Sequence, residues 1–228
     1  MAAMARRMHE VNGGHGFGPQ FVRRWVGRTA EGVHDQRDFL TQLDAAIGDA
    51  DHGVNMDRGL FAAIAKLDAS ADDGTGQILE TVGSTLVLSV GGAAGPLYGS
   101  AFRQMGRTLG DTETFDPEDL LSALRAGLEE IQRLGAATVG DKTIVDAYSP
   151  ALDAFARGLR SGQAADEAGA RARAAAEEGM RSTIPMQARK GRASYLGARS
   201  IGHQDPGATS TAILFAALEQ ALDDRSDG

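Results

Sequence analysis

The sequence predicts an all-α protein, and three observations support that class. Apolar residues recur at spacings of three and four along several long segments, as on the buried face of a helix. Alanine and leucine are abundant, whereas aromatic residues make up only 5% of the chain. No segment of strand length alternates apolar and polar residues with an excess of β-branched side chains, so we expect no sheet.

About eight helices are expected from this spacing. In chain order they cover residues 21–33, 39–44, 52–67, a segment from Pro96 onward, 118–134, 144–159, 164–182 and 209–222. The helix over 164–182 is rich in alanine and charge, and its charges are expected to form a solvated face. No Pro/Ser-rich linker or repeat divides the chain, so we expect one domain over residues 17–224. Residues 1–16 are expected to be a flexible extension without an assigned role.

Helix starts are marked by aspartate followed by proline. Asp116 precedes Pro117 and an acidic first turn, and Asp205 repeats the pattern with Pro206. Asp141 is expected to be a third N-cap.

Helix ends are marked by glycine, and one helix contains a proline. Gly110, Gly135 and Gly162 fall where periodic segments stop, as C-terminal caps do. Pro150 interrupts the helix over 144–159 and is expected to kink or split it.

Charge and composition exclude several classes of function. The formal net charge of −8 argues against a nucleic-acid or anionic-membrane partner, because phosphate backbones are bound by clustered lysine and arginine. There are no cysteines, so disulfides and thiolate metal sites are excluded. The apolar stretches are too short or too interrupted by glycine to span a bilayer, and the N-terminus lacks the apolar core of a secretory signal. A cytoplasmic protein is expected.

The segment LDAAIGDADHGVNM places three aspartates around a bend. If Asp44 ends a helix and Gly48 turns the chain, Asp49 and Asp51 project to one side of an extended segment. Three converging carboxylates repel one another unless a hard cation lies among them, and Mg²⁺ is favoured because it binds oxygen ligands and keeps room for phosphate. Calcium is a competing ion, but its twelve-residue ligand loop is absent. The alternative is that the aspartates are turn and N-cap residues.

Two helix starts are candidate phosphate sites. One helix begins near His52, directly after the aspartates, and directs unpaired backbone N–H groups toward them. The second follows the turn SVGGAAGPLYG, where Gly91 and Gly92 allow close approach, Gly95 gives conformational freedom and Pro96 starts a helix. This turn is not a Walker loop, and tight helix packing is the alternative explanation for its glycines.

Two later segments add polar candidates. GDKTIVDAY places Lys142 and Thr143 at a helix start, and RKGRASYLGARSIGHQDPGATS is a long loop rich in arginine and glycine. Arg192 is the candidate for binding phosphate, with simple solvation as the alternative. For His203 we expect a local hydrogen bond.

Four motifs together resemble one known family. LDAAIGDADHGVNM, SVGGAAGPLYGSAF, GDKTIVDAYSPAL and GRASYLGARSIGHQDPGATST occur in the order found in the nucleotide-binding L subunit of dihydroxyacetone kinase, DhaL. The resemblance covers residues from about 17 to 222 and implies a barrel of eight antiparallel helices with the nucleotide at one end. One departure is visible, because Ala94 stands where the family often has serine, which removes a hydroxyl contact to phosphate.

The resemblance also implies ligands and their residues. Asp44, Asp49 and Asp51 correspond to carboxylates that hold two Mg²⁺ ions on the phosphates of ADP or ATP, and Arg192 is expected to stabilise the transferring phosphoryl group. The positions that match nucleotide contacts are His52, Gly53, Val54, Asn55, Ala93, Ala94, Gly135, Ile144, Arg192, Asp205, Pro206 and Gly207.

The implied activity is phosphotransfer within a kinase complex. In the family the γ-phosphate passes to dihydroxyacetone held on a separate K subunit. In phosphotransferase-linked systems bound ADP is recharged by a phosphohistidine on an M subunit. The alternatives are a kinase for another small ketose such as erythrulose, a nucleotide-sensing module that docks to a transcription factor, and a helical scaffold without a ligand. The phosphoryl source and homodimer formation stay open.

Overall fold

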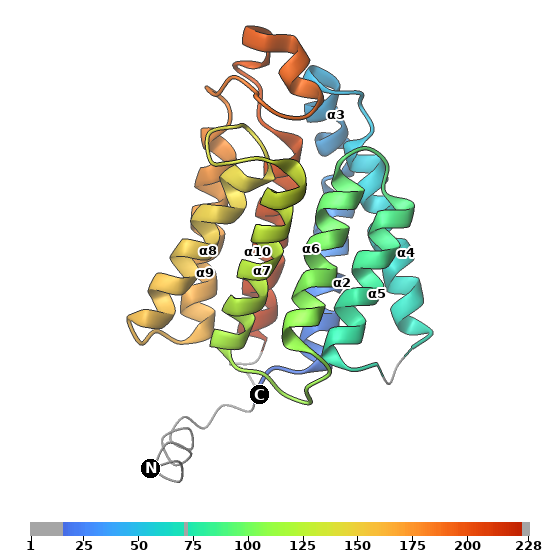
Figure 1. The fold of residues 1–228 in the computed structure, drawn as a ribbon, viewed down its shortest axis with the longest axis vertical. Helices are drawn as coiled ribbons and strands as arrows, with labels where there is room; N and C mark the ends of the chain where they lie inside the picture. The colour runs from blue at the N-terminus through green and yellow to red at the C-terminus, as the bar shows by residue number, and fades with distance from the viewer. Residues whose placement is uncertain (1–15, 71–72, 225–228) are drawn as a thin grey trace.

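A computed structural model describes residues 16–70 and 73–224, and it confirms the all-α class. This part of the chain forms nine α-helices and one 3₁₀ helix, with no strand (Figure 1). The helices are α2 (Pro19–Asp35), α3 (Arg37–Ile47), α4 (His52–Asp68), α5 (Thr75–Ser89), α6 (Ala94–Leu109), α7 (Pro117–Gly135), α8 (Ile144–Arg160), α9 (Ala165–Ser182), η2 (Arg192–Ser200) and α10 (Pro206–Asp223). The predicted N-terminal extension lies outside the described residues, apart from Gly16.

The helix that the sequence spacing missed is α5. Its buried residues lie on one broad face, but the opposite face has Glu80 as its only charged residue and also exposes Val87 and Leu88. The two faces therefore differ little in polarity, which is why the spacing of apolar residues did not reveal this helix.

Eight helices form a closed antiparallel barrel, as the resemblance implied. Successive members α2, α4, α5, α6, α7, α8, α9 and α10 pack side by side, and α10 returns to pack on α2. The shorter α3 lies at one end of the barrel, together with η2 (Figure 1). We call this the loop end; it contains residues 48–51, 90–93, 136–143 and 183–205.

The barrel interior is one continuous apolar core. Trp25 is fully buried in it, packs on Phe102 and donates its indole N–H to the carbonyl of Leu214 at 3.1 Å. Tyr148 packs edge-on against Phe215 and donates its hydroxyl to the carbonyl of Leu124. These buried polar atoms are therefore satisfied, as a dry core requires.

Paired glycines bring α5 and α6 into backbone contact. A Cβ atom on Gly83 would lie 2.3 Å from the carbonyl oxygen of Gly99, and one on Gly99 would lie 2.6 Å from that of Gly83. Gly76 and Gly106 repeat this reciprocal contact one helical heptad away. The hairpin that carries residues 90–93 is consequently fixed by its own backbone.

Most predicted helix boundaries are confirmed. Asp116 forms a capping box with Asp119, and Asp205 accepts a hydrogen bond from the amide of Ala208. Gly110 and Gly162 end their helices with φ values of 62° and 75°.

Two boundary predictions are wrong. Gly135 is the last residue of α7, and the left-handed cap is Ala136, with φ 45°. Asp141 is not the N-cap of α8. That position belongs to Thr143, whose hydroxyl accepts from Val145, while Asp141 accepts from the amide of Thr138 at 2.8 Å.

Pro150 does not split its helix, because α8 runs through it from Ile144 to Arg160. Proline has no N–H for the carbonyl of Asp146, one turn earlier. A Cβ atom on Gly179 of α9 would lie 2.2 Å from that carbonyl oxygen. The carbonyl is thus covered by the close approach of α9.

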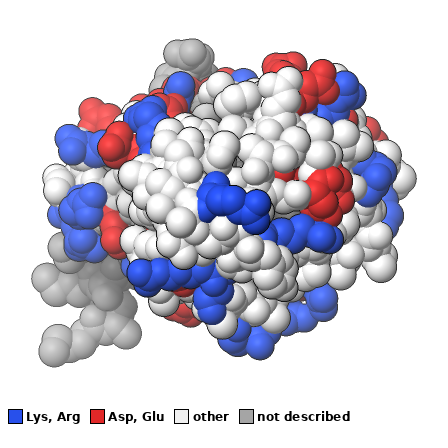
Figure 2. Space-filling model, turned by 90° about the horizontal axis from the view of Figure 1, so that it is seen from above, with Lys and Arg blue, Asp and Glu red and all other residues white. Residues whose placement is uncertain are grey.

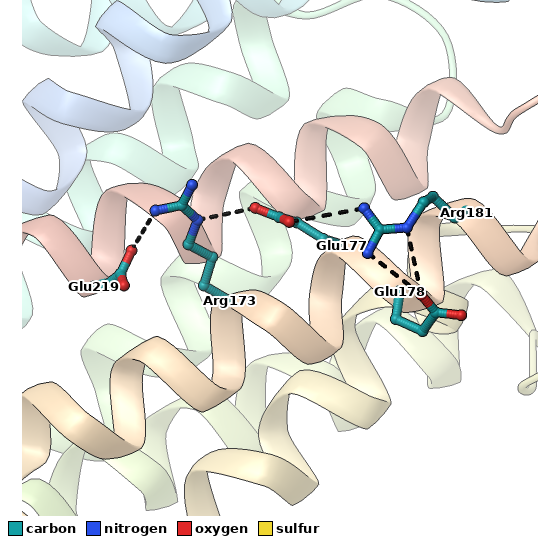
Figure 3. A network of polar contacts seen from close by, with 5 residues as sticks. All are labelled: Arg173, Glu177, Glu178, Arg181 and Glu219. Atoms are coloured by element: carbon teal, nitrogen blue, oxygen red, sulfur yellow. Dashed lines mark hydrogen bonds and ion pairs between the residues drawn. The ribbon is translucent and has the colours of Figure 1, made fainter.

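The charges of α9 are only partly a solvated face. Arg173 pairs with Glu219 of α10 at 2.7 Å and with Glu177 at 2.9 Å (Figure 3). Arg181 extends this network through Glu177 and Glu178. The network ties α9 to α10 on the barrel surface.

None of the helices in the described ranges has the length and apolar character that a membrane crossing requires.

Candidate nucleotide and metal site

A pocket of about 430 Å³ opens at the loop end of the barrel. This volume lies in the range of ligand-binding clefts. The predicted site residues that line it are Asp44, Asp49, Asp51, His52, Ala93, Ala94, Gly135, Ile144, Arg192, Asp205, Pro206 and Gly207. Segments far apart in the sequence therefore meet at one cavity.

The three aspartates converge as predicted. Each offers one carboxylate oxygen, and these oxygens all lie within 4.8 Å of one another. The prediction of an extended segment is wrong, because Ala50 between Asp49 and Asp51 adopts a left-handed conformation with φ 62°. A non-glycine residue in that region is strained by about 1 kcal/mol or more, and such strain concentrates at functional sites.

Asp44 holds the group together. It is 8% exposed near the end of α3, and its Oδ2 accepts hydrogen bonds from the amides of Asp51 at 2.9 Å and His52 at 3.2 Å. Asp44 therefore fixes the start of α4. For this residue, the alternative that the aspartates are turn and N-cap residues is partly correct. Together with the carboxylates of Asp49 and Asp51, it forms a set of oxygen donors that can bind a hard cation.

Arg192 pairs with one of these carboxylates. Its Nη2 lies 2.9 Å from Oδ2 of Asp49, and the side chains are 63% and 37% exposed. In the part of the chain that the structure describes, no other ion pair involves Asp44, Asp49 or Asp51. The guanidinium thus lies at the predicted phosphate site but balances carboxylate charge in this structure.

Four helix N-termini border the pocket, and they differ in capping. The N-caps of α8 and α10 accept backbone hydrogen bonds through Thr143 and Asp205. The N-caps of α4 and α6, Asp51 and Ala93, make no side-chain cap bond, although Asp44 accepts from the amide of His52 in the first turn of α4. The amides that begin α4 and α6 are the ones suited to an anion.

The glycine turn differs in detail from its prediction. Helix α6 begins at Ala94, so Pro96 lies inside its first turn. A Cβ atom on Gly95 would lie 2.3 Å from the carbonyl oxygen of Val90, so this glycine serves tight packing. Gly92 has φ 66° and supplies the left-handed turn.

Three predicted contact residues are not among those that line the pocket. Gly53 packs against α3, where a Cβ atom would lie 2.0 Å from the carbonyl oxygen of Arg37. Val54 is 46% exposed on the outer side of α4. Asn55 is buried and accepts from Arg58 at 2.7 Å, beside Gly91. Their assignment to the nucleotide stays a prediction.

One half of the pocket is apolar and was missed by the sequence analysis. It adds Leu97 from α6, Ile131 and Leu134 from α7, and Ala137 from the following loop to the predicted Ile144. These residues share the period of ordinary core positions, so spacing cannot separate them from the core. The surface they form suits a flat, weakly polar ring.

A hydrogen-bonded group lies behind His52. Its Nε2 is 3.1 Å from Oγ of Ser210, and that hydroxyl is 2.8 Å from Oη of Tyr98. Burial lowers the pKa of His52, although Asp44 and Asp51 oppose this. Burial also raises the pKa of Tyr98 well above its ordinary value. His52 is thereby fixed against the start of α10.

Asp205 and Lys142 are buried charges beside the pocket. Burial raises the pKa of Asp205 to about 7, while its bond from Ala208 and the charge of Lys142 oppose the shift. The ammonium of Lys142 donates to main-chain carbonyls, one of them that of His203, and burial lowers its pKa. The sequence placed Lys142 at this helix start but assigned it no role.

A model of the DAK2 domain matches residues 46–220. The chain belongs to the DAK2 domain family. The match spans Asp49, Asp51, the glycine turn and the linker before α10, and begins two residues after Asp44.

Curated relatives of this DAK2 domain cover nearly all of it. It is 42% identical over 200 residues to the PEP-dependent dihydroxyacetone kinase ADP-binding subunit DhaL of Escherichia coli strain K12, covering 88% of this chain and 95% of the relative. It is 38% identical over 192 residues to an L-erythrulose 1-kinase of Mycolicibacterium smegmatis, covering 82% of this chain but 33% of that longer protein.

A solved structure shares the fold of the DAK2 domain. The dihydroxyacetone kinase of C. freundii, in complex with AMP-PNP and Mg²⁺, matches 92% of this chain and 35% of its own, with a TM-score of 0.67 and 24% identity. The helical barrel therefore occurs in a kinase that was crystallised with a nucleotide analogue.

Proposed function

We propose that this protein is the nucleotide-binding phosphotransfer subunit of a dihydroxyacetone kinase. One observation carries the proposal. Three carboxylates converge beside two helix N-termini whose N-cap side chains make no cap bond, in a pocket that also has an apolar wall. A metal-bound polyphosphate with an attached nucleobase requires these three environments side by side. The names of the relatives, ADP-binding subunits of dihydroxyacetone kinases, agree with it.

The aspartates are the proposed metal ligands. Asp44, Asp49 and Asp51 present oxygen donors within 4.8 Å of one another, a spacing that suits Mg²⁺, and we propose two ions. When bound, Mg²⁺ neutralises the charge of the polyphosphate that is being transferred. The three side chains would hold it, while Arg192 balances the phosphoryl oxygens.

The nucleotide is proposed to lie across the pocket. The amides at the starts of α4 and α6, near His52 and Ala94, face the phosphates, and the apolar half receives the base beside Gly135 and Ile144. Asp205, Pro206 and Gly207 at the start of α10 complete the wall.

The acceptor is proposed to arrive on a separate K subunit that docks on the loop end. Figure 2 shows this end as a broad uncharged area with lysine and arginine spread over it and with acidic residues toward its margins. Exposed apolar side chains from this end are Leu88, Leu134, Val139, Ile184, Tyr195 and Ile201, with Tyr195 87% exposed. Exposed apolar area beside a pocket is typical of a protein interface.

Alternatives within the same fold differ in the partner. The erythrulose kinases among the relatives favour another small ketose as a second candidate acceptor. An M subunit that recharges ADP and a homodimer are further partners that the proposal allows. A nucleotide-sensing module would instead bind a DNA-binding regulator. The expected compartment is the cytoplasm.

Asp49→Ala tests the metal assignment. We expect the variant to lose Mg-ADP binding in calorimetry and phosphotransfer with a K subunit, while its helical circular dichroism is unchanged. Unchanged Mg-ADP affinity would refute the metal site. Purification with interacting proteins then separates the candidates, because a K-like subunit supports the kinase and a DNA-binding regulator supports the sensor.

A further inference from the structure

Lys142 is a buried lysine that the proposed chemistry does not use. It lies between α7 and α8, directly before the N-cap Thr143, and is 1% exposed. Its backbone is left-handed, with φ 63°, a conformation that costs a lysine about 1 kcal/mol or more. The surrounding structure must therefore hold this residue in place.

Every proton of the Lys142 ammonium has a main-chain acceptor. Its Nζ donates to the carbonyl of Thr183 at 2.7 Å, to that of Met186 at 3.2 Å and to that of His203. An ammonium group has three N–H donors, so none remains for a phosphate oxygen. Lys142 is thus not a phosphate ligand in this arrangement, although its side chain borders the pocket.

The three carbonyls belong to the two limbs of one linker. Thr183 and Met186 lie where the chain leaves α9, and His203 lies where it returns toward α10. Two more hydrogen bonds join these limbs, from the amide of Gly202 to the carbonyl of Ile184 at 2.8 Å and from the amide of Asp205 to Oγ1 of Thr183 at 3.0 Å. We call residues 183–186 and 202–205 the linker neck.

The linker neck carries site residues on both sides. Its returning limb ends at Asp205, and the segment that it encloses contains Arg192. That segment is seated on α3 by a small apolar cluster of Ile47, Ala188 and Ala193, separate from the main core. Besides this small cluster, the amide of Arg189 donates to the carbonyl of Asp141 at 3.1 Å, so this bond and the closure of the neck together set the position of Arg192.

We infer that Lys142 is a positioning residue, whose ammonium closes the linker neck and so holds Arg192 and Asp205 at the nucleotide. The inference rests on the proposed function for what the site binds. The closure of the neck is a separate claim about the protein without ligand.

Lys142→Met tests both parts, because methionine keeps an unbranched side chain and removes the ammonium. We expect the amides of Gly202 and Asp205 to exchange with solvent at least tenfold faster by NMR, and Mg-ADP affinity to fall about tenfold or more. Phe155→Leu is the matched control. It trims a buried core residue of α8, about three turns after that helix begins, and is expected to lower thermal stability without changing either reading.

A chemical rescue distinguishes the ammonium from the volume it fills. In Lys142→Ala the space left by the side chain borders the pocket, so a small solute can enter it. Propylammonium is expected to restore slow exchange of the two amides and Mg-ADP affinity, whereas 1-propanol, of similar size without charge, is expected to restore neither.

Three results would overturn the inference. They are normal amide exchange at the neck in Lys142→Met, an equal loss of affinity in Phe155→Leu, or equal rescue by propanol. Failure of the wild type to bind Mg-ADP would instead refute the proposed function. The exchange of the Gly202 and Asp205 amides, measured without nucleotide, would still decide whether Lys142 closes the neck.

Discussion

Replacing Arg192 by glutamine is predicted to change the affinities for metal and for nucleotide in opposite directions. The guanidinium lies 2.9 Å from Oδ2 of Asp49, so its positive charge competes with Mg²⁺ for that carboxylate. With nucleotide present, the same guanidinium is proposed to bind phosphate. Arg192→Gln therefore removes a competitor of the metal and a ligand of the nucleotide at once.

The size of each effect follows from exposure and charge. Arg192 and Asp49 are 63% and 37% exposed, and such an ion pair contributes about 0.2–1 kcal/mol. Its removal should tighten binding of Mg²⁺ alone by about 1.4- to 5-fold. A charge-assisted bond to phosphate contributes about 1.5–3 kcal/mol, so Mg-ADP affinity should fall by about 10- to 150-fold.

Isothermal titration calorimetry with MgCl₂ alone and with ADP in excess Mg²⁺ measures both effects. Lys190→Gln is the control, since Lys190 borders the same pocket and carries the same charge. It tests whether removing any positive side chain near the pocket tightens Mg²⁺ binding through long-range electrostatics, an effect that 0.15 M salt screens. If Arg192→Gln leaves Mg²⁺ affinity unchanged, or changes it no more than Lys190→Gln does, the competition is refuted.

Three further predictions concern stability. Because burial raises the pKa of Asp205 to about 7, the native state keeps a proton that the unfolded chain releases, so the wild type should lose up to about 4 kcal/mol as pH rises from about 4 to 7. Asp205→Asn, measured by urea denaturation across that range, should remove this dependence. Gly99→Ala should cost about 1–3 kcal/mol, because its Cβ would lie 2.6 Å from a carbonyl oxygen, whereas Gly27→Ala, with open space, should stabilise α2 in the same assay. Mg-ADP at about 100 times its Kd should raise Tm by about 5–10 °C, and chelation of the metal should abolish the shift; a shift that survives chelation would contradict metal-bridged binding.

Helix periodicity predicted most of the fold, and its failures have clear causes. Amphipathic helices such as α7 and α8 carry one apolar face, so spacing locates them. The pattern does not locate α5, whose exposed face carries a single charge and two apolar residues, Val87 and Leu88. Closure of the barrel depends on which helices pack together, and here the family resemblance supplied what periodicity could not.

The site was predicted where local chemistry is dense. Three aspartates within eight positions signal their own convergence, although the left-handed Ala50 that produces it has no sequence signature. Leu97 and Ile131 look like any core residue until the fold brings them to the pocket. Lys142 escaped assignment because its acceptors are main-chain carbonyls about 40 to 60 residues away, and carbonyls leave no trace in side-chain patterns.

The even number of barrel helices has a consequence for joining this unit to other domains. An up-and-down path through eight helices returns to its starting side, so α2 begins and α10 finishes at the pole away from the pocket (Figure 1). A domain attached at either point would begin about 26 Å from the cavity, the length of one 17-residue helix. To deliver an acceptor to the mouth, its tether would have to run along the outside of the barrel for about eight extended residues.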